Sequence, residues 1–201
     1  MKKLTTLCAL VGMIFVAGCT DTYPQDLQVY SFDTAIIQYE LSGNAEGEET
    51  LYIRGDQKAL HRFVTRAGVE ENMFELDLGE EMYIADLQKM TAVKSNNAEY
   101  EKLKSMTPEE QGEYLVKQEL GLKDNVDLGE PLSQKMVAGK KCDLYQVPNI
   151  GTACVWDGIV LEKEVQILDK TSKKVAVSVE TNVEIPSERF ELPEGVIKTN
   201  E

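Results

Sequence analysis

The side chains of this 201-residue sequence best suited to nucleophilic, metal or acid–base chemistry are few: four cysteines, one histidine and scattered carboxylates. His61 lies in a strand-like run, and no Gly-x-Ser-x-Gly motif or reactive-cysteine context accompanies it. Adjacent carboxylates such as Glu70 and Glu71 suit glycoside hydrolysis, but a chain with 35 acidic residues contains such pairs by chance. The acidic run at residues 124–130 lacks the alternating oxygen ligands of an EF-hand loop. We therefore expect no enzyme, no catalytic residue, no cofactor and no metal site.

Cys19 ends a segment built like a bacterial export signal. Lys2 and Lys3 form a positive start, and residues 7–17 (LCALVGMIFVA) form an uncharged apolar run. That run is much shorter than the ~20 residues that span a bilayer as a helix. It closes on residues 16–19 (VAGC), which resemble the lipobox of bacterial lipoproteins, whose cysteine is lipidated and becomes the new N-terminus. A plain secretory signal with an incidental cysteine and a buried apolar helix are the alternatives.

The lipobox resemblance implies how the chain is organised. Residues 1–18 would be a lipoprotein signal peptide, residues 19–26 a lipidated tether, and residues 27–201 a single domain. One acyl chain binds a membrane only marginally, and two or more give stable attachment. A lipidated Cys19 would therefore make the membrane a partner through its lipid anchor. In enteric bacteria an Asp after the cysteine retains the protein in the inner membrane, and here Thr20 follows. The resemblance therefore implies the cell envelope, at the outer membrane and facing the periplasm.

Cys142 and Cys154 remain as an even pair once the signal is removed and Cys19 is lipidated. Residues 147–151 (VPNIG) between them are typical of a turn, so a hairpin would bring the two cysteines to opposite strands. In an oxidising compartment we predict a structural disulfide, worth about 3 kcal/mol for a loop of this size. Two reduced thiols and a redox pair are the alternatives, although no Cys-x-x-Cys motif is present.

The charge balance excludes one class of partner. The chain has 21 Lys and Arg against 35 Asp and Glu, a formal net charge of −14. Nucleic-acid binding depends on clustered cations that neutralise phosphates, so we expect no nucleic acid as a partner. Adsorption to anionic lipid surfaces is disfavoured for the same reason.

Hydrophobic residues alternate with polar ones along most of the chain, which predicts strands. The longest alternation is Val175–Ile185, and Leu161–Ile167 has the same pattern. Short strands separated by Gly, Asn or Asp are expected at residues 37–41, 51–53, 60–65, 74–78 and 82–85. Close succession of short strands indicates an antiparallel meander. The acidic stretch Asn44–Thr50 is expected to be a solvated loop.

One helix is predicted with both of its ends. Thr107, Pro108 and Glu110 provide an N-cap, a proline in the first turn and a capping box, and Gly121 can adopt the left-handed closing conformation. A shorter helix is expected at residues 98–105, just before it.

Short motifs at residues 139–145 (GKKCDLY), 155–158 (VWDG) and 190–195 (FELPEG) accompany the lipobox, the meander and the central helix. Together they resemble an uncharacterised family of secreted bacterial domains related in shape to the lipoprotein carriers LolA and LolB. The resemblance covers most of residues 30–195. It implies an α+β fold, mainly an antiparallel β-sheet curled as a half-barrel over one or two helices. No residue matches the carriers' acyl-binding positions, so none is assigned from them.

The concave face of such a half-barrel must be covered by the helix at residues 108–120 or filled by a ligand. That helix has few large apolar side chains, so we predict an apolar pocket between it and the sheet. The expected lining residues are Phe63, Phe74, Met82, Tyr114 and Leu115. Ordinary core packing would use the same residues.

Two functions lead. The first is a non-enzymatic, membrane-anchored lipoprotein that faces the periplasm and binds an apolar ligand such as a lipid or acyl chain. The alternative is a protein-interaction or envelope-sensing module without a small-molecule ligand, whose partner is an envelope protein. An enzyme is a third class, which convergent titratable groups with perturbed pKa values would favour.

Overall fold

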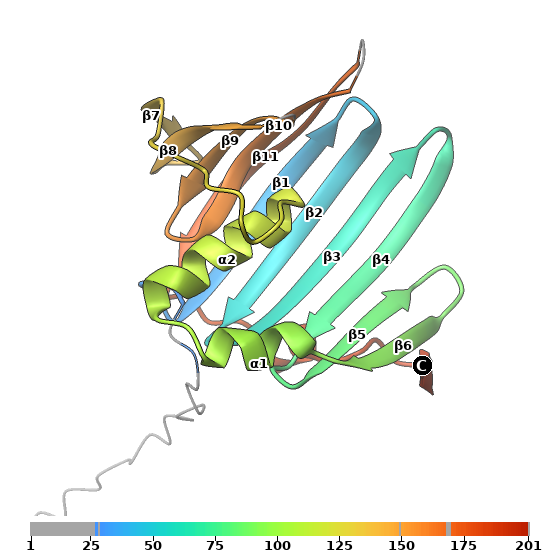
Figure 1. The fold of residues 1–201 in the computed structure, drawn as a ribbon. Helices are drawn as coiled ribbons and strands as arrows, with labels where there is room; N and C mark the ends of the chain where they lie inside the picture. Colours follow the sequence, from blue (N-terminus) through green and yellow to red (C-terminus); the bar gives the residue numbers. More distant parts are fainter. Residues whose placement is uncertain (1–26, 28, 149, 168–169, 201) are drawn as a thin grey trace, which may run out of the picture.

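The computed structural model describes residues 27, 29–148, 150–167 and 170–200. Twelve strands form one sheet in the order β12-β6-β5-β4-β3-β2-β1-β11-β10-β9-β8-β7 (Figure 1). The strands are β1 (Thr34–Ser42), β2 (Ala45–Arg54), β3 (Gln57–Arg66), β4 (Val69–Asp77), β5 (Glu81–Asp86), β6 (Thr91–Asn96), β7 (Ser133–Val137), β8 (Lys140–Val147), β9 (Gly151–Trp156), β10 (Ile159–Ile167), β11 (Lys170–Thr181) and β12 (Ile197–Asn200). Two helices, α1 (Ala98–Lys104) and α2 (Pro108–Leu120), separate β6 from β7.

Two meanders make up the sheet, as the close succession of short strands predicts. Strands β1 to β6 pair with their neighbours in chain order, and β7 to β11 do the same. Strand β11 then pairs with β1, which joins the two meanders. All of these pairs are antiparallel, and only β12 runs parallel to its neighbour, β6. The result is an open, curled α+β sheet whose edge strands are β12 and β7.

The two faces of the sheet are covered by different segments. Both helices lie on one face, and the C-terminal segment crosses the other face on its way to β12 (Figure 1). This segment contains a short 3-10 helix (Ser187–Phe190), and its buried Phe190 packs with Ala59 and Phe74 from the sheet. The face that carries α1 and α2 is called the helix face below.

Helix α2 has the ends that the sequence predicts. Thr107 Oγ1 accepts from the backbone N–H of Glu110, and Glu110 Oε2 accepts from the backbone N–H of Thr107, which completes the capping box. Gly121 closes the helix with φ 68°, a left-handed conformation that glycine adopts without a Cβ clash. The shorter helix α1 is also present where it is expected.

The loop expected at residues 44–50 is a strand instead. Strand β2 begins at Ala45 and pairs with β1 on one side and β3 on the other. Glu46 and Glu48 are exposed, whereas Glu49 points to the helix face and is only 2% exposed. The acidic composition suggested full solvation, but cations from other strands neutralise the buried carboxylate.

The alternation Val175–Ile185 is interrupted in the structure. Gln38 pairs with Ser178 and Tyr39 with Ala176, so Val177 is the extra residue of a β-bulge. The bulge reverses the facing of the strand, which buries Ala176 and leaves Val177 48% exposed. Strand β11 ends at Thr181 because Asn182 adopts a φ of 55°.

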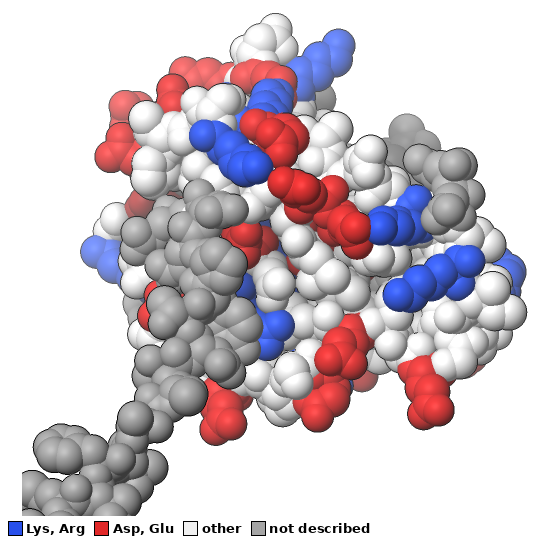
Figure 2. Space-filling view, turned by 90° about the horizontal axis from the view of Figure 1, so that it is seen from below, with Lys and Arg blue, Asp and Glu red and all other residues white. Residues whose placement is uncertain are grey.

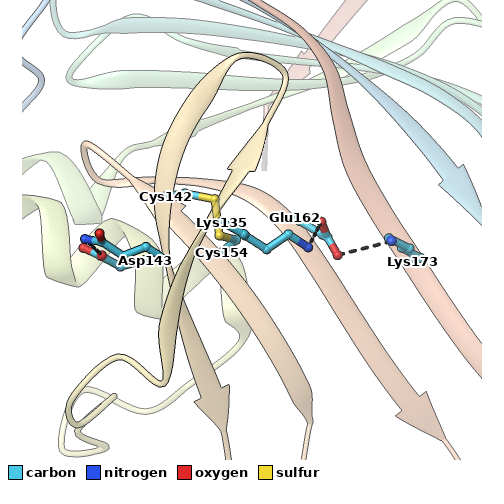
Figure 3. Close-up of a disulfide and its surroundings, with 7 residues drawn as sticks. Lys135, Cys142, Asp143, Cys154, Glu162 and Lys173 are labelled. Carbon is cyan, nitrogen blue, oxygen red and sulfur yellow. Dashed lines mark hydrogen bonds and ion pairs between the residues drawn. A yellow bond between two sulfur atoms is a disulfide. The ribbon is translucent and has the colours of Figure 1, made fainter.

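The β7–β11 end of the sheet curls back on itself. Lys135 Nζ of β7 lies 2.6 Å from Glu162 Oε2 of β10, although β8 and β9 lie between these strands in the sheet. Lys173 Nζ of β11 lies 3.2 Å from the other oxygen of Glu162 (Figure 3). The disulfide between Cys142 and Cys154 is present, as predicted, and joins β8 to β9 in the core of this curl.

The predicted signal peptide and tether, including Cys19, lie outside the described residues. The described chain begins at Leu27, which packs against Tyr100 of α1 and Tyr114 of α2. Within the part of the chain that the structure describes, no helix has the length and apolarity to cross a membrane.

Candidate ligand-binding site

An apolar cavity of about 320 Å³ lies between α2 and the helix face of the sheet. Leu115 of α2 lines it from above, and Leu51 and Leu60, which are register partners on β2 and β3, line it from the sheet. Met82 of β5 also lines the cavity. It pairs with Asp77 of β4, which in turn pairs with Lys58 of β3, so all three side chains lie on the helix face. Its further apolar lining residues include Tyr39, Ile159 and Val160. Charged side chains including Lys58, Glu75, Asp77, Glu99, Glu119 and Lys174 also contribute to its walls. This space is called the apolar cavity below.

A second cavity of about 450 Å³ adjoins the first near the C-terminal end of α2. Gln118, Glu119 and Lys174 line both cavities. The second cavity has five cationic lining residues: Arg62, Arg66, Lys163, Lys173 and Lys174. Two carboxylates, Glu49 and Glu119, share its walls. We call the second space the cationic cavity.

Figure 2 shows the molecule from below, where acidic and basic side chains intermingle across the surface.

Buried charges tie the walls of the cationic cavity together. Glu49 Oε1 lies 2.5 Å from Arg62 Nε, and Glu49 Oε2 lies 2.8 Å from Lys174 Nζ. Lys174 Nζ also lies 3.0 Å from Glu119 Oε1 of α2 and 4.3 Å from the centre of the Tyr39 ring. The cluster therefore links β2, β3 and β11 to α2 through direct ion pairs.

The environment of this cluster keeps its groups charged. Burial alone raises the pKa of the Glu49 carboxyl, but attraction to Lys174 and Arg62 and their hydrogen bonds outweigh burial, so the pKa lies below its ordinary value. Burial alone lowers the pKa of the Lys174 ammonium, but the nearby carboxylates of Glu119 and Glu49 outweigh it, so this pKa is raised. Burial raises the pKa of the Tyr39 phenol, which stays neutral. A stable set of charges suits binding and structure better than proton transfer.

A larger hollow, of about 670 Å³, lies on another side of α2. Gly112 of α2 and Gly158 of the β9–β10 turn meet there, and a Cβ added to Gly158 would lie 3.3 Å from Gly112 Cα. Its charged lining residues are all acidic: Glu109, Glu113, Asp127 and Asp157. Among the described residues, no three His, Cys, Asp or Glu side chains are grouped to hold a metal. An acidic, open hollow is a poor container for an apolar ligand.

The structure divides the five residues expected to line one pocket. Met82 and Leu115 line the apolar cavity. Leu60 of β3 faces α2, so His61 and Phe63 on the same strand face away from it. Phe74 is the register partner of His61 on β4, so it also points to the face opposite α2. Phe74 is buried there under the C-terminal segment, and Phe63 is 42% exposed. The expectation that they share a pocket with Met82 is therefore wrong, because successive residues of a strand point to opposite faces of the sheet and Met82 lies on the other face.

Tyr114 also lies outside the apolar cavity. It packs with Leu27, Tyr100 and Leu103 at the α1–α2 contact, and Lys102 Nζ lies 4.3 Å from the centre of its ring. The helical period separates Tyr114 from Leu115 by about 100°, so neighbouring residues of α2 serve different contacts. Its role is to hold the helices together.

Sequence reasoning missed the residues that complete the two cavities. Leu51 and Leu60 are recognisable as strand residues, but their partnership with Leu115 depends on where α2 lies. Glu49 and Lys174 are separated by 125 positions, and only the β1–β11 pairing brings their strands close. In the sequence, Lys173 and Lys174 are two adjacent cations directly before the alternation that begins at Val175, and this gives no sign of the partners that they meet.

The single histidine, His61, contacts side chains of the neighbouring strand β4. His61 Nε2 lies 2.8 Å from Asn72 Oδ1 on the neighbouring strand, and its ring meets Phe74 edge to face with centroids 6.4 Å apart. His61 lies on the face opposite the two cavities. It is a cross-strand contact and takes no part in the candidate site.

Comparisons with known proteins support the fold. No protein-family model matches the chain, and no curated protein matches it. An uncharacterized conserved protein from Thermus thermophilus has a similar crystal structure, with a TM-score of 0.52, 10% identity, and coverage of 84% of this chain and 91% of that one. MucB gives a TM-score of 0.38 at 10% identity, with 84% of this chain and 62% of MucB covered. PNGF-II gives 0.38 at 12% identity, with 84% and 31% covered. The likeness to the Thermus protein shows that this chain shares the fold of an open antiparallel sheet with a second, distantly similar protein.

Proposed function

We propose that this protein is a non-enzymatic lipoprotein of the cell envelope that binds an apolar ligand such as a lipid acyl chain. In this proposal Cys19 carries the lipid anchor, the outer membrane holds the protein, and the domain faces the periplasm. The half-barrel shape shared with the LolA and LolB carriers is part of the same proposal. The curled open sheet with helices on one face supports it.

The observation that carries the proposal is the apolar cavity itself. Ligand pockets of small molecules have volumes of about 300–1,000 Å³ and mostly apolar walls with a few polar groups. The apolar cavity, at about 320 Å³, has such a volume, and Leu51, Leu60, Met82 and Leu115 are part of its apolar walls, beside the charged side chains named above. Helix α2 covers the cavity with a narrow apolar stripe, as expected of a helix whose other face is rich in Glu, Gln and Lys.

A fluorescent long-chain fatty acid tests the proposal. The titration uses the full chain with Cys19→Ser, so that the protein's own lipid does not compete, and all the proteins compared keep the same N-terminal segment. Leu60→Glu places a charge in the apolar cavity and should weaken binding at least about tenfold, a difference of about 1.4 kcal/mol. Phe63→Glu is the matched control, because it places the same charge on the same strand but on the opposite face.

The outcomes separate binding from folding. Saturable binding that Leu60→Glu weakens and Phe63→Glu leaves unchanged supports the proposal, provided that both variants keep the circular dichroism spectrum of the parent. Absence of saturable binding to the folded parent would contradict it.

An interaction module is the second candidate, and one observation favours it. Ile84 and Val93 are register partners on β5 and β6, 41% and 42% exposed, on the helix face beyond the helices. Exposed apolar pairs of this kind suit contact with another protein. If no ligand binds the apolar cavity, docking of an envelope protein on this part of the sheet becomes the better explanation.

A further inference from the structure

The cationic cavity concentrates positive charge in an acidic protein. The chain has a net charge of −14, yet five cationic and two anionic side chains line this space. Four of these cations pair with carboxylates: Arg62 with Glu49, Lys174 with Glu49 and Glu119, Arg66 with Glu71, and Lys173 with Glu162. The lining itself still has more cations than carboxylates, in a molecule that is acidic as a whole, which favours an anionic occupant.

Lys163 is the cation in this cavity with the least compensation. It is half-buried on β10, and its ammonium donates to the backbone carbonyl of Glu119 at 2.8 Å. Within the described part of the chain, no carboxylate lies within ion-pair distance of it. Burial lowers the pKa of Lys163, Lys174 lowers it further, and Glu119 and Glu49 only partly oppose this. A partly desolvated ammonium without a counter-ion is unfavourable, and a bound anion would remove that penalty.

The position of the cationic cavity matters as much as its charge. It adjoins the apolar cavity, and Gln118, Glu119 and Lys174 contribute to both. Leu51 and Leu60 lie on one side of this boundary, and Lys163 and Arg66 on the other. A molecule that occupies both spaces therefore meets apolar walls at one end and cations at the other.

We propose that the ligand is an amphiphile with an anionic head group, whose apolar tail lies in the apolar cavity and whose head group lies among Lys163, Arg66 and Lys174. The proposal rests on the proposed function for the tail and adds the chemistry of the head. A carboxylate or phosphate oxygen would accept hydrogen bonds from these cations, and charge-assisted bonds of this kind are the stronger class.

Glu119 has a defined part in this arrangement. Its carboxylate is 43% exposed and pairs with Lys174 at the boundary of the two cavities. In this position it is a counter-ion that the protein itself supplies, and an incoming anion competes with it for Lys174. Removal of the Glu119 charge should therefore strengthen binding of an anionic head, whereas removal of the Lys163 charge should weaken it.

The test compares a long-chain fatty acid with the fatty alcohol of the same chain length, at a pH where the acid is ionised. The measured quantity is the ratio of the two affinities for the full chain with Cys19→Ser. The parent should prefer the acid at least about tenfold, and added salt should reduce that preference. Lys163→Gln should lower the ratio severalfold and Glu119→Gln should raise it. Lys141→Gln, at an exposed position of β8, is the control and should leave the ratio unchanged.

The possible results have distinct meanings. A preference for the acid that changes in opposite directions in Lys163→Gln and Glu119→Gln supports the head-group site. Equal affinity for acid and alcohol would overturn the head-group site and leave the apolar cavity intact as a binding site. Failure of both amphiphiles to bind the folded parent would overturn the proposed function as well. Unfolding temperatures of all variants exclude loss of the fold as the cause of a changed ratio.

Discussion

Lys174 Nζ lies 3.0 Å from Glu119 Oε1, and this ion pair joins β11 to α2 at the boundary between the apolar and cationic cavities. Lys174 also contacts Glu49, so one ammonium connects the helix to the interior of the sheet. The helix that covers the apolar cavity is therefore positioned by charge as well as by its apolar stripe.

Glu49→Gln should destabilise the fold by about 3 kcal/mol, because removal of one member of a buried ion pair leaves its partners uncompensated. Glu49 is only 2% exposed, so water cannot replace its bonds to Arg62 and Lys174. Urea denaturation measures the change in the free energy of unfolding. Glu48→Gln, at the exposed neighbouring position, should change it by less than about 0.5 kcal/mol. Equal effects of the two substitutions would contradict the role of the cluster.

The same carboxylate predicts a loss of stability in acid. The folded-state pKa of Glu49 lies below its ordinary value of 4.5. Its contribution to stability is therefore fully present above about pH 4.5 and is lost as the pH falls through the folded-state value. Wild-type stability should decline across this range, and Glu49→Gln should show a smaller decline. Parallel pH profiles of the two proteins, measured by thermal unfolding, would contradict this assignment.

Gly158→Ala tests how closely α2 approaches the β9–β10 turn. Gly158 has φ 75°, and its added Cβ would lie 3.3 Å from Gly112 Cα. Gly139 has φ 77° and open space around its position, so Gly139→Ala carries the left-handed strain alone, about 1–2 kcal/mol. Gly158→Ala should cost about 1 kcal/mol more, because the crowding displaces α2. If Gly158→Ala and Gly139→Ala lower the free energy of unfolding equally, α2 moves away without cost and the close contact contributes nothing.

The disulfide should contribute about 3 kcal/mol, the value expected for closing a loop of about this length. Peptide mapping of the oxidised protein without reductant should recover Cys142 linked to Cys154. The double variant Cys142→Ser, Cys154→Ser should lose the corresponding free energy of unfolding and loosen the β7–β11 curl. Two freely alkylated thiols in the folded protein would contradict the assignment.

Cys19→Ser should abolish lipidation and leave an unprocessed or mislocalised precursor, because the lipobox resemblance makes Cys19 the acceptor. Membrane fractionation and the shift in mass on lipidation measure the effect. A variant that fractionates and migrates like the wild type would overturn the lipid anchor.

Local sequence signals predicted the elements whose cause is local. The capping box at Thr107, the closing Gly121 and the Cys142–Cys154 hairpin depend on residues close in sequence, and the structure confirms all three. The five short strands that the sequence predicts are present as β1 to β5, with longer bounds because strand pairing extends beyond the apolar residues. The sixth strand of the first meander, β6, is not among the predicted strands.

The errors arose where distant segments decide the outcome. Composition made residues 44–50 look like a loop, but Lys174 and Arg62 come from other strands to neutralise Glu49. A bulge at Val177 reverses the alternation of β11 without any local signal that distinguishes it. The apolar character of Phe74 and Met82 predicts one shared pocket, and only the register with β3 shows that they lie on opposite faces of the sheet.

The measurement that tests the central claim most directly is native mass spectrometry of the full-length protein purified from its own cells. If the cavity under α2 holds an apolar ligand, a mass additional to the protein and its covalent lipid should appear and be released on activation. Leu60→Glu should reduce its occupancy, and Phe63→Glu should retain it. A folded protein that carries no additional mass, and that binds none from added fatty acid, would contradict the account.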